Sequence, residues 1–308
     1  MTSATRRPAV LALPLVLAAA LLSGCGAEVT TTAPPPSSPA SMSAVAESTP
    51  TNPQFSAIER RFSARLGVYA IDTGTGRLIT HRADERFAHA STFKALLAAV
   101  VLRRLPDTDR RRVVKYTEAD LLEYAPITSK HVATGMSIDA LIDAAVRYSD
   151  NTAANLLLDE IGGPQGLQRQ LRAIKDRTTN ADRNEPALNE ATPGDTRDTS
   201  TPRALGTDLR AFVLGDLLPP ARRQKLTDLL IGNTTGGPYI RAGVPAGWKV
   251  GDKTGSGGYG TRNDIAVVWP PTGSPLVIAI QSDRGVADAP SADALIAEAT
   301  KVVVATVR

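Results

Sequence analysis

Segments that favour β-strands stand at both ends of this sequence, and segments that favour helices fill the space between them. β-branched and aromatic residues recur in five strand-like runs, residues 65–72, 77–82, 248–255, 262–269 and 276–282. The Thr-Gly-Thr-Gly stretch at 73–76 predicts a hairpin between the first two runs. A hairpin pairs antiparallel and must bury one apolar face, so we expect both ends of the chain to complete one sheet. The predicted fold class is α+β: an α/β sandwich in which helices flank a five-stranded antiparallel sheet, with an inserted all-helical lobe.

Helical signals dominate the middle of the chain. Residues 91–105 are apolar almost all round, which is typical of a buried helix. Ser137 is a suitable N-cap for a helix over 138–147, and Gly162-Gly163 ends a predicted helix over 152–161. Further helices are predicted over 208–214, over 219–231 and, after a cap at Ser291, to about 304. We therefore expect a sheet lobe at about 54–85 and 232–308, a helical lobe at about 86–231, and the active site between them.

The first residues of the chain predict export. Arg6 and Arg7 precede an apolar run over 9–22 that is too short to span a bilayer, so residues 1–24 are predicted to be a signal peptide. The run ends at Leu-Ser-Gly-Cys25, which resembles a bacterial lipobox of the actinobacterial type. We expect acyl chains on Cys25 to hold the protein on the outer face of the cell membrane. An ordinary signal peptide is the alternative, and the export route (Sec or twin-arginine) and release from the cell stay open.

A tether is predicted to follow Cys25. Residues 28–53 are mostly Thr, Pro, Ser and Ala and include three consecutive prolines. Such a segment cannot bury enough apolar surface to order itself. We therefore assign residues 25–53 to the lipidated cysteine and its tether, and residues 54–308 to the catalytic domain.

The charge and the metal-binding residue types argue against several functional classes. The formal net charge of +4 includes Arg6 and Arg7, and the chain has no dense basic stripe of the kind that nucleic-acid binders carry. The single cysteine excludes an intramolecular disulfide. The three histidines, His81, His89 and His131, lack the HExxH spacing of zinc enzymes. We expect a monomeric protein that binds no nucleic acid and needs no metal or cofactor.

Ser91-Thr92-Phe93-Lys94 opens the predicted buried helix and is the only Ser-x-x-Lys match in the chain. Residues three apart share a helix face, so the Ser91 hydroxyl and the Lys94 amine can meet. Burial favours the neutral amine of Lys94, which can accept a proton from Ser91. For this motif alone, the alternative is a lysine that extends to solvent from a helix end.

Two further tripeptides complete the pattern. Ser149-Asp150-Asn151 lies in the break between two predicted helices, where local backbone capping is the common role of such residues. Lys253-Thr254-Gly255 ends a predicted strand, where glycine allows a ligand to approach the backbone closely. All three motifs in this order and spacing are expected by chance on the order of one time in a thousand or less. The capping interpretation therefore does not account for the set.

The three motifs resemble those of the penicillin-recognising serine enzymes, which include penicillin-binding proteins and serine β-lactamases. Residues 183–189 (RNEPALN) followed by 198–202 (DTSTP) resemble the Ω-loop of class A β-lactamases. The resemblance runs from about residue 62 to the last helix and includes residues 82–87 and 233–236. It implies hydrolysis of the β-lactam amide bond of penicillins and cephalosporins through a serine acyl-enzyme, giving antibiotic resistance.

The resemblance also implies a role for each motif residue in acylation. Ser91 is the nucleophile, and Lys94, or Glu185 acting through water, is its base. Ser149 passes a proton to the departing ring nitrogen, and Lys253 supports Ser149 electrostatically. Tyr124 is expected to form the aromatic wall of the cleft, and Asn151 to bind the side-chain amide of the substrate. Thr254 and Arg262 are expected to bind its carboxylate, and the backbone amides of Ser91 and Ser256 to form the oxyanion hole. The full set of residues assigned to substrate binding is Tyr124, Asn151, Asn189, Lys253, Thr254, Gly255, Ser256 and Arg262.

Deacylation is assigned to the loop that carries Glu185. A carboxylate held near an amide can position and activate water beside an acyl ester, and Glu185 and Asn189 are four residues apart. The resemblance implies that Arg183 and Asp198 pair and clamp this loop. Ser256 beside Thr254 occurs in cephalosporin-hydrolysing members, which favours penicillins and early cephalosporins as substrates.

Two other functions stay open at this point. A D,D-carboxypeptidase acting on peptidoglycan would share Ser91, Lys94, Ser149 and Lys253 but would have no use for the Glu185–Asn189 arrangement. A catalytically silent surface lipoprotein that binds peptidoglycan would keep the leader, the tether and the fold.

Overall fold

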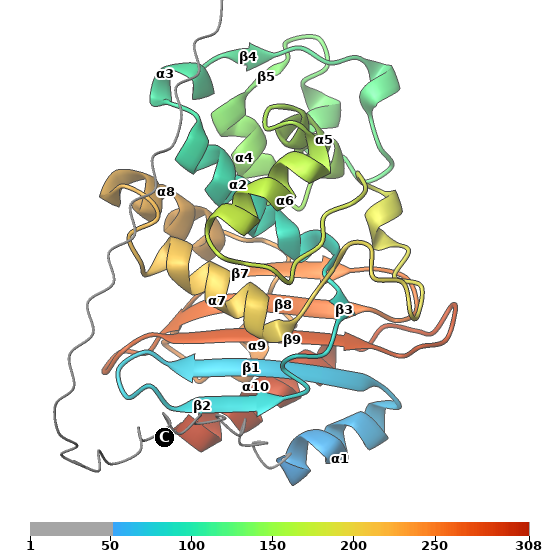
Figure 1. Cartoon of the computed structure of the whole chain (residues 1–308), viewed down its shortest axis with the longest axis vertical. Coiled ribbons are helices and arrows are strands. Elements are labelled where there is room, and N and C mark those ends of the chain that lie inside the picture. The colour runs from blue at the N-terminus through green and yellow to red at the C-terminus, as the bar shows by residue number, and fades with distance from the viewer. Residues whose placement is uncertain (1–51, 308) are drawn as a thin grey trace, which may run out of the picture. The chain divides into compact units, whose positions relative to one another are not determined.

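Five strands from the two ends of the chain form the central sheet of the computed structural model (Figure 1). The structure describes residues 52–307. The predicted signal peptide, Cys25 and nearly all of the predicted tether lie outside the described residues. The strands are β1 (Arg65–Asp72), β2 (Leu78–His81), β7 (Lys249–Ser256), β8 (Arg262–Trp269) and β9 (Leu276–Asp283), in the order β2-β1-β9-β8-β7. All neighbours pair antiparallel, so the predicted sheet and fold class are confirmed.

Both faces of the sheet are covered by helices. On β9, Val277 and Ala279 belong to the apolar core on one face, whereas Ile278 and Ile280 belong to the core on the other. This alternation follows from the two-residue period of a strand. Helices α1 (Pro53–Phe62) and α10 (Asp293–Val307) cover one face together with the short α9 (Ile240–Gly243), and α7 (Pro202–Val213) packs on the opposite face. Figure 1 shows α1 and α10, the two ends of the described chain, on the same side of the sheet.

The helical lobe surrounds the buried helix α2 (Phe93–Arg104), of which residues 93–102 are buried. It contains α3 (Asp107–Arg110), α4 (Ile138–Arg147), α5 (Asn151–Asp159), α6 (Gly163–Ala173) and α8 (Pro220–Ile231). Two pairs of two-residue strands join its connecting segments. β3 (Phe87–Ala88) pairs with β6 (Thr199–Ser200), and β4 (Val113–Val114) pairs with β5 (Met136–Ser137). Four 3₁₀ turns complete it, at Ala90–Thr92, Glu118–Asp120, Thr128–Lys130 and Ala187–Asn189.

The structure corrects several predicted element boundaries. Helix α7 begins at Pro202, capped by the Thr201 hydroxyl, six residues before the predicted start at 208. Gly162-Gly163 ends one helix but also begins the next, α6, which was not predicted. Helix α1 was missed too, because only Phe55 and Ile58 of its residues are buried and its apolar signal is weak. Its cap, Asn52, and its first residue, Pro53, lie inside the segment that the sequence assigned to the tether.

No helix within residues 52–307 is long and apolar enough to cross a membrane.

Candidate active site

Ser91 lies in the 3₁₀ turn that leads into α2, at the junction of the helical lobe and the sheet. The turn packs directly against β7. A Cβ atom added to Gly255 would lie 3.0 Å from the carbonyl oxygen of His89 and 3.1 Å from the backbone nitrogen of Thr92, so any larger residue would be crowded at this close approach. The preceding residue, Ala90, has a φ of +44°, which is a costly conformation for alanine. The serine is thereby held at the edge of the sheet, with 9% of its surface exposed.

Lys94 and Glu185 form a fully buried ion pair beside Ser91. Lys94 Nζ lies 2.9 Å from Glu185 Oε1 and donates to Ser149 O (2.8 Å) and Asn151 Oδ1 (2.5 Å). Ser91 Oγ donates to the same carboxylate oxygen over 3.3 Å. Burial lowers the pKa of Lys94, and the negative charge of Glu185 acts in the opposite direction. Within the described chain no hydrogen bond joins Ser91 Oγ to Lys94 Nζ directly; Glu185 links them.

The break between α4 and α5 positions Ser149 and Asn151 on either side of a structural aspartate. Asp150 is completely buried, caps α5 and accepts hydrogen bonds from the backbone N–H groups of Ile127 and Thr128. Ser149 has a φ of +58° and accepts a hydrogen bond from Lys253 Nζ over 3.1 Å. The capping role expected for this tripeptide therefore falls on Asp150 alone, and its two neighbours face the reacting groups.

Lys253 extends from β7 into the same buried site and is completely buried. Burial, reinforced by the positive charge of Lys94, lowers the pKa of Lys253 to about 7, while the charges of Asp252, Asp264 and Glu185 oppose this shift. Asp252 points to the other face of the strand and is bonded to the side chains of Asn233 (2.6 Å) and Arg241 (2.6 Å). Near neutral pH, Lys253 is therefore divided between its protonated and its neutral form.

Glu185 is held in place by two asparagines. Asn155 of α5 donates from Nδ2 to Glu185 O and accepts from Glu185 N, each over 2.9 Å. Asn189 Nδ2 donates to Glu185 Oε2. The remaining amide oxygen, Asn189 Oδ1, is buried and has no hydrogen-bond partner among residues 52–307. Asn155 thus fixes the backbone of Glu185 and Asn189 holds Oε2, in addition to the contacts of Oε1 with Lys94 and Ser91, and the amide oxygen of Asn189 is available for a donor.

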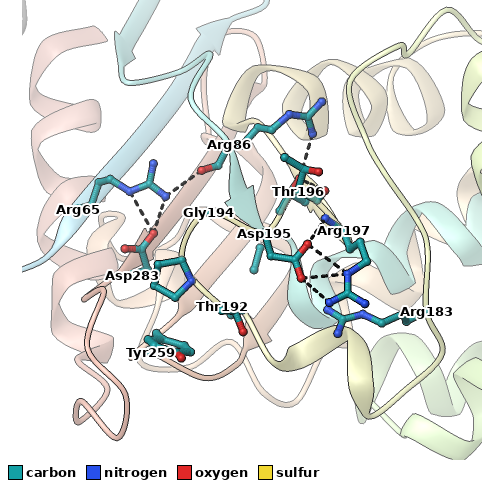
Figure 2. A pocket seen from close by; sticks show the side chains of 14 residues that line it. Arg65, Arg86, Arg183, Thr192, Gly194, Asp195, Thr196, Arg197, Tyr259 and Asp283 are labelled. Carbon is teal, nitrogen blue, oxygen red and sulfur yellow. Dashed lines mark hydrogen bonds and ion pairs between the residues drawn. The ribbon is translucent and has the colours of Figure 1, made fainter.

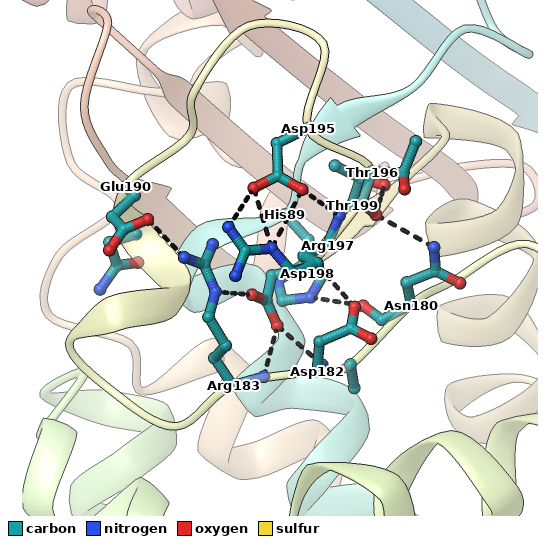
Figure 3. A network of polar contacts seen from close by, with 12 residues as sticks. His89, Asn180, Asp182, Arg183, Glu190, Asp195, Thr196, Arg197, Asp198 and Thr199 are labelled. Carbon is teal, nitrogen blue, oxygen red and sulfur yellow. Dashed lines mark hydrogen bonds and ion pairs between the residues drawn. The ribbon is translucent and has the colours of Figure 1, made fainter.

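The loop over residues 183–198, which we call the Ω-loop, is closed at its neck by Arg183 and Asp198 (Figure 3). Arg183 Nε donates to Asp198 Oδ2 over 2.6 Å, and the other oxygen of the buried Asp198 accepts from the backbone N–H groups of Asp182 and Arg183. Arg183 also pairs with Glu190, further along the loop. The two ends of the loop are therefore joined by a charge-assisted network rather than by an apolar core.

A cleft of about 300 Å³ opens in front of these groups. Eight of the predicted residues line it: Ser91, Tyr124, Ser149, Asn151, Asn189, Thr254, Gly255 and Ser256. The charged residues Lys94, Glu185 and Lys253 lie behind this surface. The cleft also includes Thr235 and Tyr239, to which the sequence analysis assigned no role. Thr235 Oγ1 lies 2.5 Å from Thr254 Oγ1, and its position in the Asn-Thr-Thr-Gly stretch at 233–236 was the one available signal.

Arg262 does not line the cleft. Its Nε donates to Asp293 over 2.9 Å and its Nη1 to Thr261 O over 2.9 Å. Tyr239 interacts with both Ser256 and Asp293, and burial raises its pKa. Arg262, which was predicted to bind the substrate carboxylate, is therefore not part of the cleft surface, whereas Thr235, Tyr239 and Thr254 are.

Within the described residues, no group of three or more His, Cys, Asp and Glu side chains is arranged to hold a metal ion.

Comparisons with known proteins agree with this geometry. The sequence model described as the beta-lactamase enzyme family matches residues 51–307. A beta-lactamase of Amycolatopsis lactamdurans is 59% identical over 82% of this chain and 83% of its own length, and one of Bacillus amyloliquefaciens is 56% identical over 82% of each. The crystal structure of a class A beta-lactamase from Clostridium kluyveri matches with a TM-score of 0.82 at 48% identity, over 83% of this chain and 98% of that one.

Proposed function

Because this chain belongs to the beta-lactamase enzyme family, it hydrolyses the β-lactam amide bond through a serine acyl-enzyme and gives antibiotic resistance, and we propose that Ser91 is its nucleophile. The observation that supports this most directly is the shared contact of Ser91 and Lys94 with one oxygen of Glu185. A serine hydroxyl becomes a nucleophile when an adjacent base removes its proton.

In acylation, Ser91 Oγ attacks the carbonyl carbon of the four-membered ring while its proton passes to a base. Glu185 accepts that hydrogen bond in the resting enzyme, and the depressed pKa of Lys94 makes its amine a second acceptor. The carbonyl oxygen becomes an oxyanion, to be stabilised by the backbone N–H groups of Ser91 and Ser256. Collapse of this intermediate breaks the C–N bond and leaves an ester on Ser91.

The departing ring nitrogen needs a proton, which Ser149 supplies; the proton taken from Ser91 then passes through Lys94, whose Nζ lies 3.5 Å from Ser149 Oγ, and restores the Ser149 hydroxyl. Lys253 donates a hydrogen bond to Ser149 Oγ over 3.1 Å, and Lys94 donates to the carbonyl oxygen of the same residue over 2.8 Å, so two amines lie beside Ser149. A protonated Lys253 stabilises the serine oxygen as it loses its proton, and attracts the carboxylate that penicillins and cephalosporins carry. Asn151 binds the side-chain amide of the substrate and Thr254 binds its carboxylate, while Arg262, held by Asp293 outside the cleft lining, contributes positive charge near Tyr239.

Deacylation relies on Glu185 and Asn189. Glu185 removes a proton from a water molecule that Asn189 Oδ1 helps to hold, and the resulting hydroxide attacks the ester carbonyl. The proton then returns to Ser91 Oγ as the ester bond breaks, which restores the enzyme and releases the ring-opened acid.

The test of this assignment is covalent labelling combined with turnover. A fluorescent penicillin is expected to label wild-type protein only transiently while nitrocefin is hydrolysed, and Ser91→Ala is expected to lose both signals. Persistent labelling of the wild type without turnover would identify a penicillin-binding protein, and absence of any label would indicate a silent binding protein. Protein for these assays should begin at Thr51 so that the Asn52 cap of α1 is kept.

We also propose that the enzyme is a monomeric lipoprotein, exported and anchored on the outer face of the cell membrane through Cys25. The support is the leader sequence and its lipobox. Metabolic labelling with palmitate tests it: Cys25→Ala should lose the label and release active enzyme into the medium, and a label that persists in this variant would contradict the assignment. Light scattering of the soluble form tests the monomer.

Penicillins and early cephalosporins are the substrates we propose. Ser256 and Thr254 at the cleft edge support this choice. A panel of penicillins, cephalosporins and carbapenems would rank them by kcat/KM, and carbapenems in first place would overturn it.

A further inference from the structure

A second cavity, of about 390 Å³, lies on the other side of the Ω-loop and shares no lining residue with the substrate cleft. Residues 191–197 of the loop form much of its wall. Figure 2 shows Arg65 and Asp283, at the ends of β1 and β9, on one side, and Arg183 and Arg197, grouped around Asp195, on the other. Its volume falls in the range of small-molecule sites, about 300–1,000 Å³.

Arginine is the most frequent charged residue in the wall of this cavity. Four arginines line it, Arg65, Arg86, Arg183 and Arg197, against two carboxylates, Asp195 and Asp283. Three more carboxylates reach these arginines from outside the lining: Glu85 contacts Arg65, and Glu190 and Asp198 contact Arg183. Arg86 alone among the four has no ion pair with any described residue; it donates one hydrogen bond, to Thr199 Oγ1 over 3.0 Å.

Several guanidinium N–H groups of these arginines donate no hydrogen bond to any residue in the described range 52–307. Arg86 uses Nη1, and Arg197 uses Nε and Nη2, both toward Asp195. Arg183 uses Nε and Nη1. The hydrogen bonds to Asp195 dominate the raised pKa of Arg197, and the positive charge of Arg183 acts against it, so two like charges are held close together.

The donor geometry selects the kind of anion. A guanidinium presents its N–H groups in a planar fork that matches carboxylate and phosphate oxygens in pairs. Asp195 already occupies this fork on Arg197, at 2.7–3.2 Å, so the site accepts a carboxylate. A halide has a single acceptor atom and cannot match the two N–H groups of a fork with two separate oxygens.

We propose that this cavity is a binding site for a compact dianion, a phosphate or a dicarboxylate, held mainly by Arg86 and Arg197. The ligand connects the Ω-loop to β3 and to the edge of the sheet, and it competes with Asp195 for Arg197. This inference does not depend on the catalytic assignments, because none of the cavity's principal contacts takes part in them.

The test is a titration followed by the backbone amide resonances of the wild-type enzyme. Sodium phosphate and sodium succinate are added separately, against sodium chloride at the same ionic strength. Saturable shifts of amides in residues 191–197 with either dianion, and none with chloride, would support the proposal. Shifts confined to cleft residues such as Ser149 and Thr254, or no saturation with both dianions, would overturn it.

Variants that remove either a positive or a negative charge from the cavity make the test specific. Arg86→Gln and Arg197→Gln should each raise the Kd at least tenfold, whereas Asp195→Asn, which removes the competing carboxylate without changing its shape, should lower the Kd several-fold. The matched control is Arg77→Gln, the same change at an exposed arginine outside the cavity, for which the Kd should stay within twofold. Equal Kd values in Arg86→Gln, Asp195→Asn and wild type would reject the site.

Discussion

The hydroxyl oxygen of Ser91 lies 3.3 Å from Oε1 of Glu185, a residue 94 positions further along the chain. The same carboxylate oxygen lies 2.9 Å from Lys94 Nζ. One acidic side chain therefore contacts both the proposed nucleophile and the nearest amine, in a site from which solvent is largely excluded. Acylation and deacylation both depend on this contact, but they should not be equally sensitive to its loss.

Replacement of Glu185 by Gln should trap the acyl-enzyme. The substitution removes the negative charge that raises the pKa of Lys94, so the neutral amine becomes more available and acylation continues. No other described carboxylate contacts Ser91, so deacylation should fall by about 10²–10⁴-fold, the usual contribution of a general base. Intact-protein mass spectrometry with a penicillin should show a lasting adduct on Ser91. Glu118→Gln, an exposed acid without an ion pair in the described chain, is the control and should clear the adduct like wild type; a short-lived adduct in Glu185→Gln would refute the role.

The value of kcat/KM should fall as the pH rises through about 7, because Lys253 then loses the positive charge that supports Ser149 and attracts the substrate carboxylate. Arginine stays charged at every accessible pH. Lys253→Arg should therefore move the falling limb of the profile of kcat/KM to higher pH, and Lys253→Met should lower kcat/KM across the range. An unchanged falling limb in Lys253→Arg would assign it to another group.

Loss of the Ω-loop clamp should cost more stability than loss of an exposed ion pair. Arg183→Gln leaves the buried Asp198 with its two backbone donors, so we expect a loss of about 1–3 kcal/mol in the free energy of unfolding and slower deacylation. The exposed pair of Arg203 and Asp84 provides the comparison: Asp84→Asn should cost about 0–1 kcal/mol. Urea unfolding of both variants measures the difference, and equal losses would mean that the loop is held by other contacts.

Asn155 should act as a positioning residue for Glu185. Its two hydrogen bonds hold the backbone of Glu185, so Asn155→Ala should let the carboxylate move and slow deacylation about tenfold or more, with acylation less affected. Gln165→Ala is the matched control, because Gln165 is exposed and makes one long hydrogen bond, 3.4 Å, to the adjacent Asp182. Pre-steady-state hydrolysis separates the two steps; a parallel fall in acylation and deacylation in Asn155→Ala would point to general disruption instead.

Asp208 should make the enzyme less stable as the pH rises. Burial, together with the charge of Asp176, raises the pKa of Asp208 from 3.8 to about 9 in the folded state. Between these values the folded protein binds a proton that the unfolded chain has released, so the stability from this group is full below 3.8 and is lost as the pH rises to about 9. Asparagine stays neutral at every pH. Asp208→Asn should therefore raise the free energy of unfolding by about 1–3 kcal/mol at pH 8 and by much less at pH 5.

Chemical unfolding at the two pH values tests this prediction, with Asp216→Asn, an exposed aspartate near the end of the same helix, as the control. A gain in Asp208→Asn that is the same at both pH values would show that this carboxyl does not titrate as the structure indicates.

Elements rich in apolar residues were predictable, and largely polar elements were not. The strand over 262–269 and the helix over 138–147 were predicted at their observed bounds, because the strand contains a β-branched, apolar run between turn residues and Ser137 marks the start of an amphipathic helix. Helix α6 was missed, since it is largely polar and follows two glycines that normally end a helix. Its few buried residues acquire their partners only when α5 packs beside it.

The sequence by itself determined the chemistry that this protein carries: a serine three residues before a lysine, a second serine beside an asparagine, a lysine at a strand end, and an acid in a charged loop. Each is a local pattern, and a local pattern can be recognised from the order of residues alone. Only the tertiary structure decided that Glu185 contacts Ser91 directly, that Arg262 turns toward Asp293 instead of the cleft, and that Asn155 and Tyr239 belong to the site. Those relationships join segments far apart in the chain, and their distances are set by the packing of α2, α5 and β7 around one buried cluster of charges, which no spacing along the sequence encodes.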